Sequence, residues 1–462
     1  MRARVCSPNV ALPVLGCEGM SFALFVVYLL VVFVRPSEQF ADLREWPLFE
    51  VASILALVGA ALAVLMGSRP ALRGIQVPLI VALVIWMAFT VGLSPLRSVE
   101  GFEKVLGFVK GPVTAFMLVL LNVTTVRRVR AIAFFLTIAA LFLAERTISD
   151  YQRHAEEVAR SVSGDLETPG ADTEWDNPEP EQPRYRFDPN QEFRVMNKGL
   201  FGDPNDLALT LIAILPFTLI QRRSGALLRN VLFVWLPVAV ILYGVYATKS
   251  RGGVLALAAV IGLLVRHRLG NTLSVATTGV MVVLLLGAGF VGSRSMAIDV
   301  SASGRIDMWS AGLQNLKQSP IWGIGYRNFD VINGKAAHSA FAQCFAELGM
   351  VGYLLWLGVL LLTLDDLRLI HASTNEEAAE LRKWSRAIQV SLIGFLVGAI
   401  FLSRAWDVQL FILIGLGTAI AELARRRGYL VRSRPVLLWL YIVSLAAVSS
   451  IIGYWLYMRL LR

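Results

Sequence analysis

The chain has 462 residues, of which 56% are hydrophobic and 16% charged, and its mean hydropathy is +0.63. Soluble domains carry about 25% charged residues, so this composition excludes a water-soluble globular protein. The formal net charge is +10. Because the Lys and Arg residues lie between apolar segments, this charge indicates membrane topology and anionic lipid headgroups, and no nucleic-acid partner is expected.

Taken in chain order, apolar segments of about 17–25 residues recur along most of the sequence, which is the length that crosses a bilayer as a helix. Helices are expected because lipid offers no partner to backbone N–H and C=O groups. We predict an all-α integral membrane protein, a polytopic bundle of about 12–13 transmembrane helices that forms a single domain over 1–462. The predicted helices cover 21–34, 48–66, 75–93, 102–121, 131–147, 206–220, 229–247, 252–266, 273–291, 341–364, 386–402, 406–424 and 436–457.

The first predicted helix is followed by Arg35-Pro36 and not by a small-residue cleavage site. This pattern predicts a retained helix, with Met1 or Met20 as the start. Every second connection is basic, which assigns those connections and the N-terminus to the cytoplasm. They carry Arg69 and Arg73; Arg127, Arg128 and Arg130; Arg222, Arg223 and Arg229; Arg266 and Arg268; Arg368, Arg382, Lys383 and Arg386; and Arg425, Arg426, Arg427, Arg432 and Arg434. With thirteen helices the C-terminal tail lies outside; with twelve it lies in the cytoplasm.

Two long connections fall on the outer side. The connection at 148–205 contains a stretch at 164–192 that is rich in Pro, Asp and Glu, which predicts a disordered acidic insertion. The connection at 292–340 mixes apolar and polar residues and is expected to fold, as short helices that lie on the membrane. Both connections end in a predicted helix, so polar side chains at those ends reach the outer membrane surface.

Polar residues gather where the outer connections meet the helices. Before the helix at 206–220, Asp203 is a helix cap with Pro204 at the first position, whereas Asn205 and Asp206 have to enter the membrane boundary. Arg251 stands in Ser250-Arg251-Gly252-Gly253, where helix-end N–H groups and a guanidinium fork suit a phosphate. The alternative for Arg251 is that it extends toward outer headgroups.

The second outer connection carries Arg305 and Asp307 at the start of an amphipathic helix, with an ordinary ion pair as the alternative. His338 precedes the helix near Phe341, and a His near pH 7 can act as a base. Glu347 lies nine residues on, as an intramembrane partner or a ligand contact. Arg404 and Asp407 share another outer turn, where their mutual pairing is the simpler account.

No metal or cofactor is expected. The four His residues lie far apart, and Cys6, Cys17 and Cys344 form no disulfide or metal-ligand spacing.

Several stretches, in this order, resemble the O-antigen ligase family, which includes O-antigen ligases, polysaccharide polymerases and bacterial oligosaccharyltransferases. They are Gly202-Asp203-Pro204-Asn205-Asp206-Leu207-Ala208, Ser250-Arg251-Gly252-Gly253, Ser303-Gly304-Arg305, Pro320-Ile321-Trp322-Gly323-Ile324-Gly325-Tyr326-Arg327-Asn328-Phe329, and His338-Ser339 through Glu347-Leu348-Gly349. The resemblance covers about 195–425. This chain departs from the family in its acidic insertion and in an extra C-terminal helix.

The resemblance implies a membrane glycosyltransferase of the GT-C type in the bacterial inner membrane, with its site facing the periplasm. It implies a donor glycan on undecaprenyl diphosphate and an acceptor hydroxyl on a glycan, on lipid A core or on a protein. Arg251 and Arg305 would contact the diphosphate and His338 would be the base, without metal and with inversion. Asp203, Asn205, Asp206, Asp307, Glu347 and Arg404 are the candidate substrate-binding residues.

Alternatives remain open. An exopolysaccharide or O-antigen polymerase of the same superfamily fits these residues. A transporter or flippase for lipid-linked glycans would place polar groups near mid-bilayer in broken helices, whereas here they collect at one boundary. A scaffold of an export complex is a third class.

Overall fold

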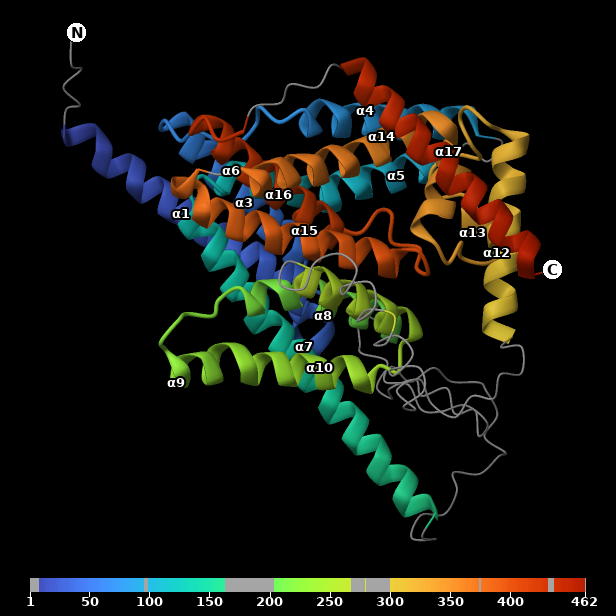
Figure 1. Ribbon diagram of the computed structural model, residues 1–462, viewed down its shortest axis with the longest axis horizontal. Helices are drawn as coiled ribbons and strands as arrows, with labels where there is room; N and C mark the ends of the chain where they lie inside the picture. Colours follow the sequence, from blue (N-terminus) through green and yellow to red (C-terminus); the bar gives the residue numbers. More distant parts are fainter. Residues whose placement is uncertain are drawn as a thin grey trace. The chain divides into compact units, whose positions relative to one another are not determined.

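The computed structural model describes residues 8–94, 99–162, 203–266, 279, 300–373, 375–430 and 436–461. The regular elements of the described residues are all helices, with no strand (Figure 1), as the predicted all-α class requires. The predicted helix at 273–291, apart from residue 279, and the acidic insertion at 164–192 lie outside the described residues. Most of the remaining predicted helices agree with the structure to within a few residues.

The helices, in chain order, are α1 (Pro8–Val34), α2 (Pro36–Gln39), η1 (Ala41–Leu43), α3 (Leu48–Leu65), α4 (Gln76–Leu93), α5 (Val99–Phe108), η2 (Val109–Val113), α6 (Thr114–Asn122), α7 (Val126–Val162), α8 (Pro204–Leu219), α9 (Leu227–Asn230), η3 (Val231–Trp235), α10 (Leu236–Ala247), an unlabelled helix at 251–266, α12 (Val300–Gln318), α13 (Phe329–Asn333), α14 (Ala340–Ala372), η4 (Glu376–Ala378), α15 (Ala379–Ala399), α16 (Val408–Arg426) and α17 (Val436–Leu461).

Nine helices of the described part are long and apolar enough to cross a membrane. They are Gly16–Val34, Leu48–Leu65, Gln76–Leu93, Val99–Asn122, Val126–Arg153, Leu227–Ala247, Ala340–Ala372, Val408–Arg426 and Leu438–Arg459. Helix α8 is a shorter apolar helix. The chain is therefore a multi-pass membrane protein, because no soluble fold leaves so many apolar helices of this length.

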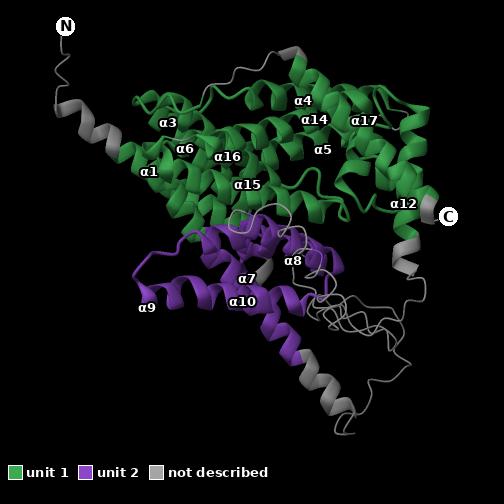
Figure 2. Cartoon of the chain, viewed as in Figure 1, with its two compact units in different colours: residues 1–32, 47–135, 296–462 green, residues 33–46, 136–295 purple. Residues whose placement is uncertain are grey.

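Two compact units make up the chain (Figure 2), a division that the sequence did not indicate. Unit 1 contains Met1–Val32, Pro47–Phe135 and Met296–Arg462, and unit 2 contains Phe33–Trp46 and Leu136–Ser295. In unit 1, helix α14 is central and packs against α4, α12, α15 and α16. Helix α16 is almost entirely buried, whereas most of α17 is exposed.

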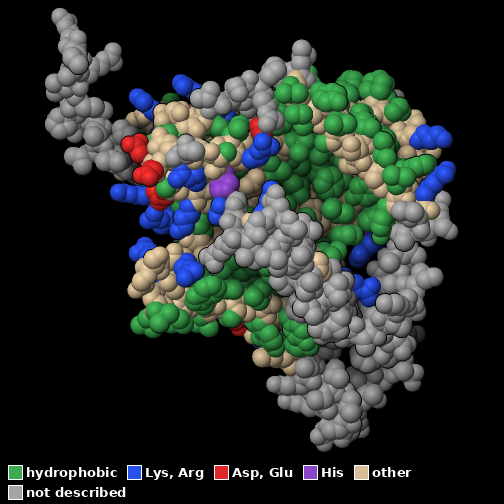
Figure 3. Space-filling model, in the orientation of Figure 1, with side chains coloured by type: hydrophobic (Ala, Val, Ile, Leu, Met, Phe, Trp, Pro, Cys, Tyr) green, Lys and Arg blue, Asp and Glu red, His purple; other side chains and the backbone are tan. Residues whose placement is uncertain are grey.

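One end of unit 1 gathers the basic connections. Arg130 pairs with Glu380 at 2.5 Å, and Arg426 donates to the Arg69 carbonyl at 2.8 Å. Tyr429 also donates to Glu377 at 2.7 Å, so the connections near 69, 130, 380 and 426 lie together although the sequence separates them widely. Figure 3 shows Lys, Arg, Asp and Glu side chains gathered at this end of unit 1 and hydrophobic side chains over its middle. This arrangement is the one that the alternating charge pattern predicts.

The opposite end of unit 1 gathers connections of the other parity. Ser94 donates to the Ile324 carbonyl at 2.9 Å, and the His338 N–H donates to Ser403 Oγ at 2.8 Å. The connection at 292–340 contributes α12 and α13 to this end. The candidate residues Arg305, His338 and Arg404 all belong to these connections.

Unit 2 is built on α8 and α10. A Cβ on Gly244 of α10 would lie 2.9 Å from Ala144 of α7, so a small residue lets these two helices approach. Helix α7 continues to Val162, and residues 148–162, expected as part of a loop, are helical. The physical reason is that this polar stretch is rich in Ala, Glu and Arg, which favour a helix once an apolar segment has started it.

Candidate functional site

In unit 2, hydrogen bonds join the starts of two helices. Asp203 caps α8: its Oδ1 accepts from the Asn205 backbone N–H at 2.8 Å and from Asn205 Nδ2 at 2.7 Å. Ser250 Oγ donates to Asn205 Oδ1 at 2.7 Å and accepts from the Gly253 N–H at 3.0 Å. Asp203 and Asn205 therefore hold the turn before the helix at 251–266. The predicted cap at Asp203 is confirmed.

Arg251 is the first residue of the helix at 251–266 and is half-buried. Lys249 precedes it with a left-handed backbone, φ 50°, and its ammonium lies 3.8 Å from the centre of the Tyr246 ring. A Cβ on Gly253 would lie 2.9 Å from Ala208 Cβ, which explains a glycine where the two helices approach. Asp206 is buried within the first turn of α8. This turn thus places the half-buried Arg251 at a helix N-terminus, an arrangement that favours an anion, whereas Lys249 is buried against Tyr246.

In unit 1, His338 has a left-handed backbone with φ 50°. For a residue with a Cβ this conformation costs about 1–2 kcal/mol, so the surrounding structure has to hold it. The His338 N–H donates to Ser403 Oγ, and its carbonyl accepts from Trp309 Nε1 at 3.4 Å. The next residue, Ser339, caps α14 and its hydroxyl lies 2.5 Å from Tyr454 Oη. The half-buried His338 is thereby fixed between α12, α14 and the turn at 403.

Arg305 lies one turn before Trp309 on α12, and so on the same face of that helix. This face meets α14: Gly312 is within van der Waals reach of Phe329, Phe345 and Ala342. Because Trp309 donates to His338, the half-buried Arg305 belongs to the face of α12 that leads to His338. Asp307 is exposed. It lies two residues after Arg305 and therefore on another side of the helix.

Glu347 is a buried partner within unit 1. Its carboxylate accepts from Trp406 Nε1 at 2.9 Å, from Gln343 Nε2 at 3.3 Å and from the backbone of Arg327. It is 1% exposed, so of the two roles predicted for it the structure supports that of an intramembrane partner. Arg404 pairs with Asp407 at 3.4 Å, and Asp407 caps α16, as the simpler account of that turn predicts.

Two turns beyond the helix start, α14 is broken at Gly349, which has φ 65°. The carbonyls freed by the break accept backbone N–H groups of the connection after α12: Ile324 donates to Ala346 at 3.0 Å and Gly325 to Glu347 at 2.9 Å. Trp86 Nε1 donates to the Leu348 carbonyl at 2.9 Å. The connection at 319–328 is thus fastened to the broken helix, which satisfies the buried carbonyls.

A cavity of about 490 Å³ lies beside this connection. Phe108, Tyr326 and Trp406 form an aromatic wall, with ring centres 5.5 Å apart for Tyr326–Trp406 and 5.8 Å for Phe108–Trp406. Lys104, Arg327 and Asp330 supply its charged lining. Burial raises the pKa of the Tyr326 phenol to about 12, against the opposing effect of Arg327, so the phenol stays neutral and can donate a hydrogen bond.

The sequence reasoning missed Arg327, Lys104 and Trp406 as lining residues. Arg327 has φ 59°, a conformation that no sequence pattern reveals for an Arg. The available signal was the pair Gly323 and Gly325, which indicates a tight connection. Burial lowers the pKa of Arg327, but the attraction of Tyr326, Glu347 and Asp330 outweighs it and the pKa is raised, so the guanidinium stays charged.

Residues 236–357 match the family model described as O-antigen ligase. This part of the chain is similar to the O-antigen ligase family. The matched region contains Arg251, Arg305, His338 and Glu347, and it lies within the resemblance at 195–425. A comparison with curated proteins finds no match to the chain. The matched region thus includes Arg251 of unit 2 and His338 of unit 1.

Proposed function

We propose that this protein is a glycosyltransferase that moves a glycan from undecaprenyl diphosphate to an acceptor hydroxyl at the periplasmic face of the bacterial inner membrane. The match of residues 236–357 to the O-antigen ligase family supports an enzyme of the ligase or polymerase type. The observation that carries the proposal is the strained backbone of His338, held by Ser403 and Trp309 next to the face of α12 that bears Arg305.

In the proposed reaction, the acceptor oxygen attacks the anomeric carbon and forms the new glycosidic bond. The bond from that carbon to the diphosphate oxygen breaks, and its electron pair leaves with the diphosphate. His338 takes the proton of the acceptor hydroxyl. General-base catalysis of this kind accelerates a reaction by about 10²–10⁴-fold. Arg305 stabilises the charge on the leaving diphosphate. Attack opposite the leaving group inverts the anomeric carbon.

Room for sugars is supplied by the cavity beside Trp406. Its aromatic wall offers apolar surface to sugar rings, and Lys104, Arg327 and Asp330 offer hydrogen bonds. Trp406 lies three residues after Ser403, which holds His338. The cavity therefore belongs to the same end of unit 1 as the proposed base.

A transporter is the less favoured function. Helix α14 is broken, as helices of transporters are. The carbonyls at Ala346, Glu347 and Leu348, however, already accept hydrogen bonds from Ile324, Gly325 and Trp86. Their hydrogen bonds are thus satisfied without a transported ion or sugar, which favours the enzyme.

The test uses membranes that contain the full-length protein, a lipid-linked glycan, and lipid A core, polysaccharide or protein as acceptor in turn. His338→Asn is the informative variant, because Asn tolerates the left-handed backbone and removes the base. We expect transfer to fall by about 10²-fold or more with an unchanged amount of protein in the membrane. Arg305→Ala should also abolish transfer, whereas the exposed Lys335→Ala is a matched control. Wild-type transfer by His338→Asn would remove His338 from the reaction.

A further inference from the structure

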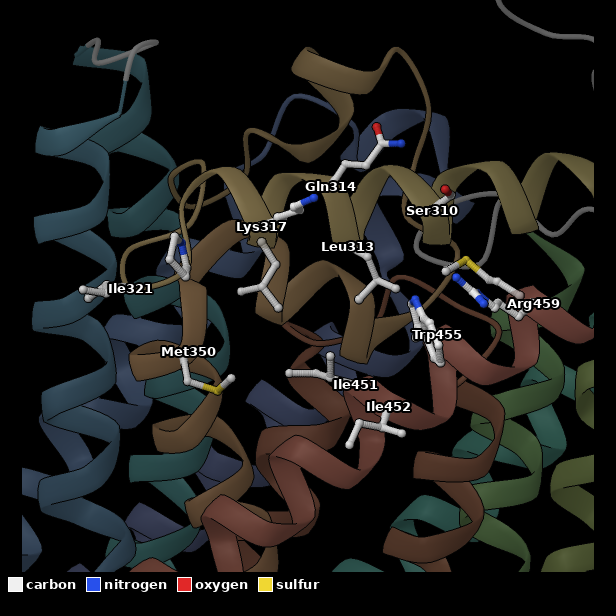
Figure 4. A pocket seen from close by; sticks show the side chains of 13 residues that line it. Ser310, Leu313, Gln314, Lys317, Ile321, Met350, Ile451, Ile452, Trp455 and Arg459 are labelled. Carbon is white, nitrogen blue, oxygen red and sulfur yellow. The ribbon is translucent and has the colours of Figure 1, made fainter.

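A second, larger cavity lies in unit 1 outside the proposed site. It is a groove of about 820 Å³ between α12 and α17 (Figure 4). Leu313 and Lys317 reach it from α12, and Ile451, Ile452, Trp455 and Arg459 from α17. The volume is within the range of about 300–1,000 Å³ that holds small-molecule ligands.

The two helices give the groove an apolar part and a charged rim. Leu313, Ile451 and Ile452 form apolar walls, and Lys317 and Arg459 are the charged residues of the lining, which contains no Asp or Glu. The Arg459 guanidinium lies 4.6 Å from the centre of the Trp455 ring. This contact holds the cation at the rim. A ligand that fits such a lining has an apolar chain and an anionic head.

The groove lies where a bilayer would supply that ligand. Helix α17 is an apolar span over Leu438–Arg459, and most of its residues are exposed, including Ile452 and Trp455. Arg459 ends this span, which places it at the level of the headgroups. The apolar walls lie nearer the middle of the span and face the depth of acyl chains.

The groove is also separate from the proposed reaction centre. Arg305, Trp309 and Gly312 recur at helical spacing on the face of α12 that meets α14. Leu313 and Lys317 follow Trp309 in steps of four residues and line the groove farther along the helix. Lys317 lies twelve residues after Arg305, about 18 Å along the axis of α12, so a donor diphosphate at Arg305 and a ligand head at Lys317 would not occupy the same place.

We propose that the groove binds an anionic phospholipid, with one acyl chain along Leu313, Ile451 and Ile452 and its anionic headgroup at the rim that carries Lys317 and Arg459. The occupant is a bilayer lipid because the walls continue from the lipid-exposed surface of α17. It is anionic because two cations face it without a carboxylate in the lining. The bound lipid fills the space between α12 and α17 and so supports the helix that carries Arg305.

The test measures lipid retention by the full-length protein. Protein purified in a neutral detergent is mixed with phosphatidylglycerol or phosphatidylcholine, and bound lipid is counted by native mass spectrometry. We expect a preference for phosphatidylglycerol, and Lys317→Ala/Arg459→Ala should weaken its binding about 30-fold, about fivefold for each cation. The control Arg44→Ala/Lys335→Ala removes two exposed cations elsewhere and should retain it.

A second variant tests the apolar walls. Leu313→Trp narrows the groove without a change of charge and should reduce the binding of phosphatidylglycerol. If Leu313→Trp or the double variant Lys317→Ala/Arg459→Ala impairs folding, the single variant Lys317→Gln tests the charged rim in its place. Equal binding of the two lipids, or equal retention by the wild type and the double variant, would overturn the proposal. The readout is lipid binding alone, so a failure of the glycosyl transfer proposal would not affect it.

Discussion

At the scale of single residues, Glu347 joins the connection at 319–328 to the turn that carries Trp406. Replacing it with Leu leaves the Trp406 indole N–H and the Arg327 backbone N–H without this acceptor. A buried donor left unsatisfied costs about 1–3 kcal/mol, so Glu347→Leu should lower the free energy of unfolding by about 2–4 kcal/mol. Detergent-induced unfolding, followed by circular dichroism, measures this change.

Glu347→Gln is the matched control for that substitution. The amide oxygen still accepts from Trp406, so the free energy of unfolding should fall by only about 1 kcal/mol. If Leu and Gln lower the free energy of unfolding equally, the hydrogen bond to Trp406 is not what makes Glu347 important.

Residue roles were the part of the site that the sequence predicted least completely. It correctly indicated the cap at Asp203 and the pair Arg404–Asp407, because these are contacts between neighbours in sequence. It left two roles open for Glu347, because the partner Trp406 is separated by 59 residues. Long-range partners depend on how helices pack, and one sequence does not specify that packing.

At the scale of elements, the connection at 319–328 and the break in α14 form one structure. Gly323 has φ 69°, and a Cβ there would lie 2.5 Å from the Ala346 and Glu347 carbonyls and from the Gly349 nitrogen. Gly323→Ala should therefore separate the connection from α14 and destabilise the protein by about 3 kcal/mol or more. The measurement is the same detergent unfolding.

Gly92→Ala provides the comparison for this element. Gly92 is a helical residue in α4 with no heavy atom within 4 Å of an added Cβ. Because Ala favours a helix by about 1 kcal/mol over Gly, this variant should be as stable as the wild type or more stable. A Gly323→Ala protein as stable as Gly92→Ala would show that the connection tolerates a side chain.

Most elements were predictable because apolar length specifies a membrane helix directly. The sequence did not indicate the irregular turns within helices, because these turns leave the apolar character of a segment unchanged. The π-helical turns at η2 and η3 interrupt two spans without altering composition. The break at Gly349 likewise depends on hydrogen bonds from another connection. Helix α7 extends beyond the predicted end at residue 147 because its last part is polar, and a prediction based on hydropathy stops where the apolar segment stops.

At the scale of the whole molecule, the charge pattern links sequence to sidedness. In unit 1 the basic connections near 69, 130, 380 and 426 share one end, and those that carry Arg305, His338 and Arg404 share the other. Alternate connections of a bundle have to emerge on opposite sides of a membrane. The positive-inside rule then predicts that the basic end lies in the cytoplasm and that His338 lies in the periplasm.

Labelling of single cysteines checks this sidedness in intact cells. In a variant without Cys6, Cys17 and Cys344, a cysteine introduced at the exposed Lys335 should react with a membrane-impermeant maleimide. A cysteine at the exposed Arg427, beyond the opposite end of α16, should react only after the inner membrane is opened. Because Lys335 is three residues from His338, the reverse pattern would place the proposed base in the cytoplasm. Transfer at the periplasmic face would then be excluded.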